Sequence, residues 1–204
     1  MGIAQRKLRK YSATRKLILD AALDLYLQQG LENTTIRKIA QKIEYSPTAI
    51  YLHYQNKNAI LYDMQKIAFD ILFKYLRANQ TEGSAYLRLK HLGKAYIDFG
   101  VKYPKYYDLM FILRSPMEGV QEEHPFKNYQ ETCAFMLGVM TDCISKGQVK
   151  YTDPKTAILH YWAILHGLTS LYINKRLSVI ANDKKQTIDS MHQAWDAYIS
   201  SVRA

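Results

Sequence analysis

The stretch TTIRKIAQKIEYSPTAIYLHYQNK, residues 34–57, specifies how the first third of this chain folds. In its first part, apolar residues recur at intervals of three and four, which is the spacing of one buried helix face. These residues are Ile36, Ile39, Ala40 and Ile43. Ser46 and Pro47 then supply an N-cap and a first-turn proline for a second helix. Because only the short turn EYS separates the two helices, they are predicted to form a helix-turn-helix.

The second of these helices is too polar and too aromatic for a core helix, since only Ile50 suits the interior. The second helix of a helix-turn-helix can lie in the major groove of DNA. Hydroxyl and ammonium groups there can donate to phosphates, whereas other side chains can approach base edges and thymine methyls. The first group comprises Tyr51, Tyr54 and Lys57, and the second comprises Thr48, Ala49 and His53. For both tyrosines, packing against neighbouring helices is the alternative.

The start of the preceding helix offers a further phosphate site, because the backbone N–H groups of a first helical turn are free. Thr35 and Arg37 lie in that turn. The complete set of predicted DNA contacts is Thr35, Arg37, Ser46, Pro47, Thr48, Ala49, Tyr51, His53, Tyr54 and Lys57. A basic arm upstream adds non-specific attraction to phosphates through Arg6, Lys7, Arg9, Lys10, Arg15 and Lys16.

The positive charge of the chain is concentrated near this motif. The formal net charge is +10, and residues 1–60 hold 10 of the 28 Lys and Arg but only 4 of the 18 Asp and Glu. A basic segment attached to a nearly balanced body indicates a polyanionic partner at one end. General solubility is the alternative explanation for the positive charge, but it does not account for the asymmetry.

Helical periodicity continues through the 204 residues, and no alternating strand pattern is found. The predicted fold class is therefore all-α, with about nine helices. A three-helix DNA-binding domain, residues 1–57, is expected to precede a helical ligand-binding and dimerisation domain, residues 58–204. The predicted helices cover about 12–29, 34–43, 46–54, 56–77, 84–102, 104–111, 126–146, 154–180 and 183–203, with a loop at 114–125.

Two C-terminal helices carry the spacing of a helix-packing seam. The seam residues are Ile158, Tyr161, Leu165, Leu168 and Tyr172 in one helix and Met191, Trp195 and Tyr198 in the other. Within one chain, these helices can simply pack on each other. However, the first of them is also apolar on a second face, so it needs cover on both sides. That face comprises Trp162, Ile164, Leu171 and Ile173. A second subunit would supply that cover, which predicts a homodimer.

Large aromatic side chains and a histidine are concentrated in the helices of the C-terminal domain. The set comprises Phe69, Tyr96, Phe99, Tyr107, Phe111, Phe135, Trp162 and His166. A bundle interior of this composition is either a solid core or the wall of a ligand pocket. His166 is either a core histidine with satisfied hydrogen bonds or a hydrogen-bond donor to a ligand.

The segment TTIRKIAQKIEYSPTAIYLHYQNKNAILYDM, residues 34–64, resembles the DNA-binding signature of the tetracycline-repressor (TetR) family of transcription regulators. The matching parts are the T-x-R-x-I-A start of the first helix, the Y-x-H-Y end of the second helix and the following NKNAIL. Tyr54 is a departure, since the family often has Phe there. Further along, YYDLMF (106–111) and WAILHG (162–167) resemble a subgroup with a W-x3-H-G motif. The resemblance implies a homodimer, a small-molecule pocket in the C-terminal domain and repression relieved by a ligand.

Other classes of protein lack support in the sequence. It contains no glycine-rich phosphate loop, no Cys/His metal spacing and no carboxylate pair on one helix face, so neither an enzyme nor a bound cofactor or metal is predicted. Cys133 and Cys143 are expected to be reduced thiols. No apolar run reaches the roughly 18 residues of a membrane span. The basic N-terminus has no apolar signal-peptide core behind it, so a cytoplasmic protein is expected.

The function predicted from these features is transcriptional regulation by sequence-specific binding to double-stranded DNA. The protein is expected to act as a homodimeric repressor on a palindromic operator, from which a small, mostly apolar effector releases it. A non-specific architectural DNA-binding protein and a constitutive regulator without a ligand are the alternatives. The identity of the effector does not follow from composition, because the shape of a pocket depends on the angles between helices.

Overall fold

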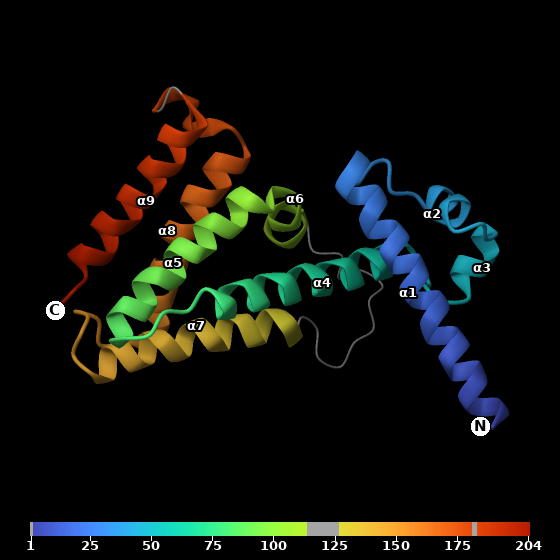
Figure 1. The fold of residues 1–204 in the computed structure, drawn as a ribbon, viewed down its shortest axis with the longest axis horizontal. Helices are drawn as coiled ribbons and strands as arrows, with labels where there is room; N and C mark the ends of the chain where they lie inside the picture. The colour runs from blue at the N-terminus through green and yellow to red at the C-terminus, as the bar shows by residue number, and fades with distance from the viewer. Residues whose placement is uncertain (1, 114–126, 181–182) are drawn as a thin grey trace. The chain divides into compact units, whose positions relative to one another are not determined.

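The computed structural model describes residues 2–113, 127–180 and 183–204, and every regular element in these ranges is helical (Figure 1). The α-helices are α1 (Ile3–Gln29), α2 (Ile36–Lys42), α3 (Pro47–Tyr51), α4 (Lys57–Ala78), α5 (Ala85–Lys102), α6 (Pro104–Tyr107), α7 (Lys127–Ser145), α8 (Pro154–Ile173) and α9 (Lys184–Ser201). A π-helical turn, η1 (Asp108–Ile112), follows α6, and a 3₁₀ turn, η2 (Arg176–Val179), follows α8. The predicted all-α class is confirmed for the described residues. Within the same ranges, no helix is long and apolar enough to cross a membrane.

The described residues divide into two compact units, one ending at residue 67 and the other containing residues 68–113 and 127–204. This division falls within α4, whereas the sequence places the domain boundary at the start of that helix. The first half of α4 belongs to the first unit because Asp63 accepts hydrogen bonds from both Arg15 and Tyr54.

The first unit packs α2 on α1 and α3 on α2. Ile18 of α1 and Ile50 of α3 have no exposed surface, and Ile39 of α2 is equally buried. The buried residues of α2 therefore fall on its predicted apolar face. Leu17 differs from expectation, because 43% of its surface is exposed on the side of α1 that faces away from this core.

In the second unit, α5 contacts α7, α8 and α9. Two glycines of α5 let neighbouring side chains approach its backbone. A Cβ atom at Gly93 would overlap the indole of Trp195 in α9, and one at Gly100 would overlap the methyl group of Thr169 in α8. Trp195 also donates its indole N–H to the carbonyl of Lys90 at 2.9 Å. These close contacts make α5 the central element of this core.

Two helix bounds differ from the predicted ones. α1 begins at Ile3 rather than near residue 12, because no helix-breaking residue follows Gly2 in the basic arm. α8 ends at Ile173 rather than near residue 180, because Lys175 adopts a left-handed backbone with φ of 55° and the chain continues as η2. The predicted loop at 114–125 lies outside the described residues.

Candidate nucleic-acid interface and interior pocket

Side-chain caps and a tight turn set the ends of α2 and α3. The Thr35 hydroxyl accepts a hydrogen bond from the Lys38 N–H at 3.2 Å, and the Ser46 hydroxyl accepts one from the Ala49 N–H at 3.2 Å. Between the helices, Glu44 takes a left-handed backbone with φ of 58°, which lets the chain reverse over a few residues. Ser46 is therefore the N-cap that the sequence predicts, Thr35 caps α2 in the same way, and both hydroxyls are already used by the backbone.

One side of α3 is buried and the opposite side is open to solvent. Ile50 has no exposed surface, whereas Tyr51 is 54% exposed and Thr48 is also exposed. Arg37, near the start of α2, is exposed as well. Among the other predicted contacts in these two helices, Ser46 and Pro47 are exposed and Ala49 is half-buried. The open side of α3 is thus available to a large external partner.

Two exposed apolar residues of this segment were not predicted as contacts. Leu52 is 74% exposed, directly after α3, and Tyr45 in the turn is exposed too. In a DNA groove, an aliphatic side chain can contact thymine methyl groups. The signal was present in the sequence, because a residue two positions after buried Ile50 points away from the core face of a helix.

Tyr54 is buried, so its prediction as a phosphate contact is wrong. Only 2% of its surface is exposed, and its hydroxyl donates to Asp63 Oδ2 at 2.9 Å. Arg15 donates to the same oxygen at 2.8 Å, and its guanidinium lies 4.3 Å from the centre of the Tyr54 ring. Burial and the neighbouring Asp63 raise the pKa of Tyr54, which keeps its hydroxyl a donor. Arg15 therefore holds this core together and is not a free cation of the arm.

His53 and Lys57 are partly engaged within the unit. The His53 ring lies 4.5 Å from the ring of Tyr11, centre to centre. Burial and nearby Arg15 lower the pKa of His53, so its ring is neutral near pH 7. The Lys57 ammonium donates to the Leu31 carbonyl at 2.9 Å. DNA contacts by either residue stay predictions.

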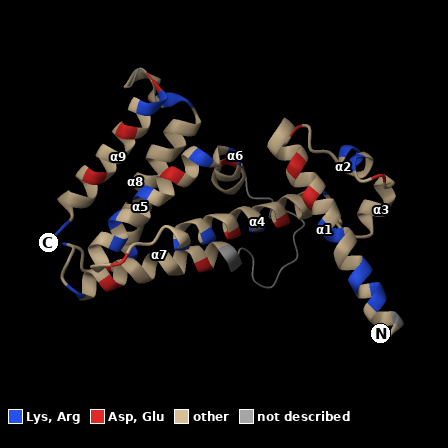
Figure 2. Cartoon of the chain, in the orientation of Figure 1, with Lys and Arg blue, Asp and Glu red and all other residues tan. Residues whose placement is uncertain are grey.

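The basic arm forms the first turns of α1, where Lys and Arg residues gather (Figure 2). No carboxylate occurs in the sequence before Asp20, so this helix segment carries positive charge without local neutralisation. The exposed cations of the arm are Arg6, Lys7, Arg9, Lys10 and Lys16.

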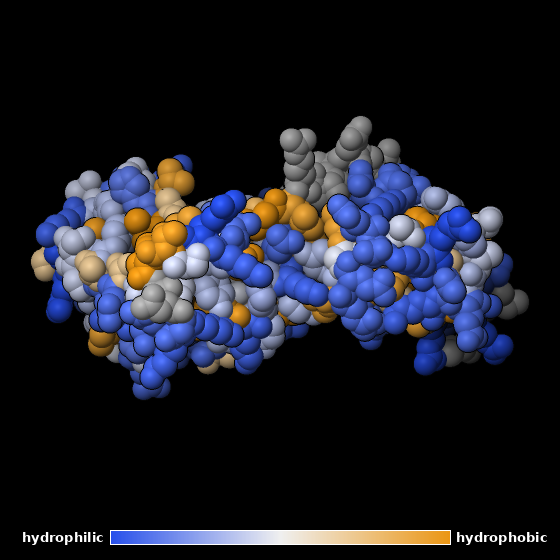
Figure 3. Space-filling view, turned by 90° about the horizontal axis from the view of Figure 1, so that it is seen from above, coloured by the Kyte–Doolittle hydropathy of each residue, from blue (hydrophilic) through white to orange (hydrophobic). Residues whose placement is uncertain are grey.

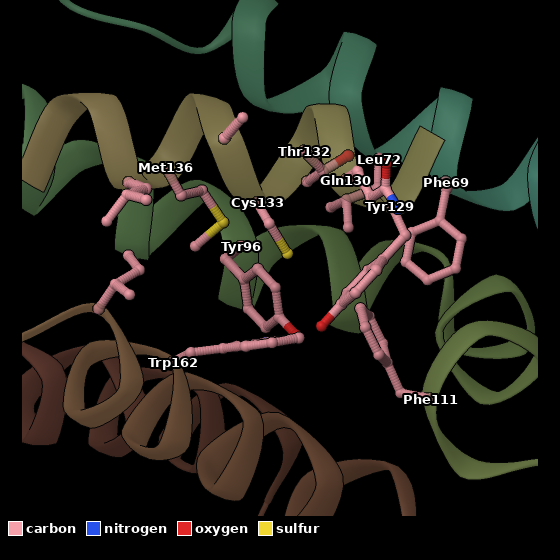
Figure 4. Close-up of a pocket in the computed structure, with 13 residues that line it drawn as sticks. Phe69, Leu72, Tyr96, Phe111, Tyr129, Gln130, Thr132, Cys133, Met136 and Trp162 are labelled. Atoms are coloured by element: carbon pink, nitrogen blue, oxygen red, sulfur yellow. The ribbon is translucent and has the colours of Figure 1, made fainter. Parts of the chain in front are cut away.

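The second unit contains a pocket with a volume of about 350 Å³, which lies within the size range of small-molecule sites. Residues of α4, α5, η1, α7 and α8 line it (Figure 4). Four of the predicted ligand residues are among them, namely Phe69, Tyr96, Phe111 and Trp162. The alternative of a solid aromatic core therefore does not describe this region.

The other four predicted ligand residues do not line this pocket. Phe99 and Tyr107 have no exposed surface and belong to the core. Phe135 instead packs edge-on against Phe73, with the ring centres 5.8 Å apart. His166 shares a hydrogen bond of 2.7 Å with the Tyr107 hydroxyl, and burial lowers its pKa. His166 is half-buried, and its Nδ1 atom has a hydrogen-bond partner within the protein.

Residues of α7 also line the pocket, among them Met136 and two residues that the prediction missed, Tyr129 and Cys133. Their spacing of four and three residues places them on one helix face, a signal that the sequence did contain. Burial raises the pKa of the Cys133 thiol, which is not part of a disulfide. Among the described residues, no three His, Cys, Asp or Glu side chains come together as metal ligands would.

Most of the predicted dimer seam lies inside a single subunit. Tyr161, Leu165 and Trp195 have no exposed surface, and Met191 is nearly as buried. The rings of Tyr161 and Trp195 meet edge to face with their centres 4.9 Å apart, so α8 and α9 of one chain pack on each other here. Assigning these four residues to a subunit interface is wrong, because their side chains cannot reach a partner. Ile158 lines the pocket instead.

A different side of α8 is open to solvent. Leu159 is 63% exposed, and Ile164 and Leu171 are also exposed. Apolar side chains also gather at the surface of this unit in Figure 3, where they are orange. The remaining residues of the predicted seam, Leu168, Tyr172 and Tyr198, are half-buried.

Comparison with known protein families gives a match for each unit. Residues 18–64 match the model of bacterial regulatory proteins of the tetR family. Residues 89–195 match the model of the tetracyclin repressor-like C-terminal domain. The first match contains the helix-turn-helix, and the second contains most residues of the pocket wall.

Among curated proteins, the chain is 27% identical to the uncharacterized HTH-type transcriptional regulator YobS of Bacillus subtilis over 95 residues, which are 47% of this chain and 50% of that protein. It is 39% identical to the HTH-type transcriptional regulator TcmR of Streptomyces glaucescens over 59 residues, 29% of this chain and 25% of that protein. It is also 36% identical to the class D tetracycline repressor protein of Escherichia coli over 61 residues, 30% of this chain and 27% of that protein. These matches span half or less of the relatives' length.

Solved structures match over nearly the whole chain. A protein of unknown function from Rhodococcus sp. RHA1 has a TM-score of 0.75 at 17% identity, covering 93% of this chain and 95% of that one. A TetR-family regulator from Pectobacterium atrosepticum has a TM-score of 0.74 at 14% identity, covering 96% and 97%. At such low identity these likenesses show the fold alone. Because the C-terminal family model matches more than half of the sequence and the N-terminal model matches the helix-turn-helix, the chain belongs to the TetR family of bacterial regulatory proteins.

Proposed function

We propose that this protein is a transcriptional regulator that binds a palindromic DNA operator as a homodimer and is released from it by a small effector. The observation that carries the proposal is the open side of α3, where Thr48 and Tyr51 are exposed while Ile50 anchors the helix from behind. Membership of a family of regulatory proteins supports the same class of function.

Each exposed side chain suits a particular part of a DNA groove. The Arg37 guanidinium and the Tyr51 hydroxyl can donate to phosphate oxygens, which positions the protein without reading sequence. Thr48 can contact a base edge or a thymine methyl group, which does read sequence. The exposed cations of α1 add an attraction that weakens as salt concentration rises.

Footprinting on genomic fragments, including the region upstream of the protein's own gene, tests DNA recognition. We expect protection of one or a few inverted repeats whose half-sites lie about one helical turn apart, or a multiple of that distance. Equal protection of every sequence would favour the architectural alternative. Absence of protection on every fragment at low salt would contradict DNA binding.

The homodimer is proposed to form through the open side of α8. Leu159, Ile164 and Leu171 supply apolar surface there, and the small residues Ala163 and Gly167 allow a partner helix to approach closely. Leu159, Ala163, Gly167 and Leu171 recur every four residues, and Ile164 adjoins Ala163, as expected for one helix face. A two-fold axis through this contact would present two copies of α3 to a palindromic site.

Leu159→Glu is expected to separate the subunits, because the new carboxylate would have to lose its hydration in an apolar contact, at a cost of several kcal/mol. Sedimentation equilibrium should show a monomer, and operator affinity should fall with it. Leu87→Glu is the matched control, since Leu87 is 44% exposed on α5. If the Leu159 variant still sediments as a dimer, the subunit interface does not include the open side of α8.

Release by an effector is supported by the pocket and by the course of α4. This single helix contributes Asp63 to the first unit and Phe69 and Leu72 to the pocket wall of the second. An effector weakens operator binding only if it binds the non-operator state more tightly. Coupling of about 1–3 kcal/mol, roughly 5–150-fold in affinity, is typical of such linkage. Operator affinity that no pocket ligand alters would indicate the constitutive alternative.

A further inference from the structure

The wall of the pocket in the second unit discriminates among ligands by its charge, its shape and its hydrogen bonds. We propose that its ligand is an uncharged, flat, mostly apolar molecule with one hydrogen-bond-accepting oxygen, such as an aryl or fused-ring ketone, and that Tyr129 holds this oxygen. The inference rests on the proposed effector function and names the chemical class of the effector.

Aromatic rings give the pocket flat walls. Tyr129 lies 5.3 Å from Phe69 and 5.6 Å from Trp162, measured between ring centres, and Phe69 lies 5.5 Å from Phe111. Figure 4 shows these side chains entering one space from α4, η1, α7 and α8. A planar ligand can stack on such rings and bury most of its surface, which favours a flat apolar body.

The charge of the wall excludes ionised ligands. None of the described residues that line the pocket is Lys, Arg, Asp, Glu or His. A carboxylate or ammonium group that entered would lose its hydration without gaining a counter-charge from these residues. The ligand is therefore neutral at the position where it touches this wall.

Most polar groups of the wall already have partners inside the protein. The Trp162 indole N–H donates to the Tyr96 hydroxyl at 3.2 Å, and Tyr96 in turn donates to the Tyr107 hydroxyl at 3.2 Å. The Tyr107 hydroxyl then shares its hydrogen bond of 2.7 Å with His166. Gln130 and Thr132 also interact within the protein. Because the Trp162 N–H and the Tyr96 O–H already donate within this chain of hydrogen bonds, neither group can donate to a ligand without losing its present partner.

Tyr129 differs from these groups in the strength of its hydrogen bond, because the partner of its hydroxyl is the thiol of Cys133. Sulfur is a weak hydrogen-bond acceptor, and a ketone, ether or amide oxygen is a stronger one. A ligand oxygen can therefore replace the thiol at little loss, whereas replacing a partner of Tyr96 would break a bond between two oxygens. Burial also raises the pKa of Tyr129, so its hydroxyl stays protonated and able to donate.

Equilibrium dialysis of the full chain at neutral pH with three naphthalenes of equal ring size tests the proposal. The probes are 2-acetylnaphthalene, 2-ethylnaphthalene and 2-naphthoate. We expect the ketone to bind at least roughly tenfold more tightly than the carboxylate. Tyr129→Phe should weaken the ketone about fivefold, the effect of one hydrogen bond, and should change the affinity for the ethyl compound less than about twofold.

Tyr106→Phe is the matched control, because Tyr106 is a half-buried tyrosine outside the pocket wall and its change should alter neither affinity. Tighter binding of naphthoate than of the ketone would overturn the neutral-ligand assignment. Equal weakening of ketone and ethyl compound by Tyr129→Phe would overturn the role of Tyr129. Absence of binding by all three probes would overturn the whole inference, yet it would leave DNA recognition intact if footprinting without probe still shows protected repeats.

Discussion

Gly93→Ala is expected to destabilise the second unit by about 1–3 kcal/mol, even though alanine is the better helix former. The reason is that the added Cβ would overlap the Trp195 indole. That ring is fully buried, and its N–H is fixed to the Lys90 carbonyl, so it has no free space into which to turn. Urea unfolding followed by tryptophan fluorescence measures the effect, because both tryptophans, Trp162 and Trp195, lie in this unit.

Gly138→Ala provides the matched control for that measurement. Gly138 lies within α7, and no atom would come within 4 Å of its added Cβ. The same substitution should therefore stabilise the protein by about 0.5–1 kcal/mol, because it lowers the backbone freedom of the unfolded chain. A shift of the same sign and size for both variants would contradict the close packing of α5 against Trp195.

Thr48→Glu is expected to lower operator affinity by roughly 30-fold or more while leaving the free energy of unfolding nearly unchanged. Thr48 is exposed in the first turn of α3, where a carboxylate stays hydrated and is favoured by the helix dipole. In a DNA groove the same carboxylate would face phosphate charge. Two copies per dimer, at about 1–3 kcal/mol each, give the expected loss, which fluorescence anisotropy with a labelled operator at fixed salt would measure.

Gln29→Glu introduces the same charge at an exposed residue at the end of α1, outside the helix-turn-helix. Its operator affinity should stay within about twofold of the unmodified protein, since long-range repulsion is screened at physiological salt. An equal loss in both variants would attribute the effect to net charge rather than to position. If the Thr48 variant binds the operator with unchanged affinity, α3 does not form part of the DNA interface.

Much of the fold was predictable because its signals are local. The caps at Thr35 and Ser46 and the first-turn proline act within one turn of helix, so the bounds of α2 and the start of α3 follow from neighbouring residues. The burial of Ile39 and Ile50 follows from helical spacing in the same way. The all-α class and the family signature rest on these short-range patterns.

The aromatic composition of the pocket wall was predictable from the sequence, but the particular residues that line it were not. Phe69 and Phe111 line it, whereas Phe99, an equally aromatic residue, is core. Composition cannot separate these cases, because a side chain lines a cavity only when the helices around it fail to meet there. Similarly, the seam spacing of Tyr161 and Trp195 identified a packed pair of helices, but it did not determine whether the two helices belong to the same subunit or to different ones.

Tyr51 and Tyr54 show where prediction from the sequence stops. Both are tyrosines of the same short segment. The spacing of four residues from buried Ile50 favours the core side for Tyr54, but α3 ends at Tyr51, so helical spacing alone does not determine where the Tyr54 side chain lies. The sequence specifies the helix-turn-helix, its caps and its charge, since those depend on residues a few positions apart. The three-dimensional arrangement buries Tyr54 because Asp63, nine positions later, and Arg15, from α1, meet around it, while Tyr51 has no such neighbours and stays in solvent.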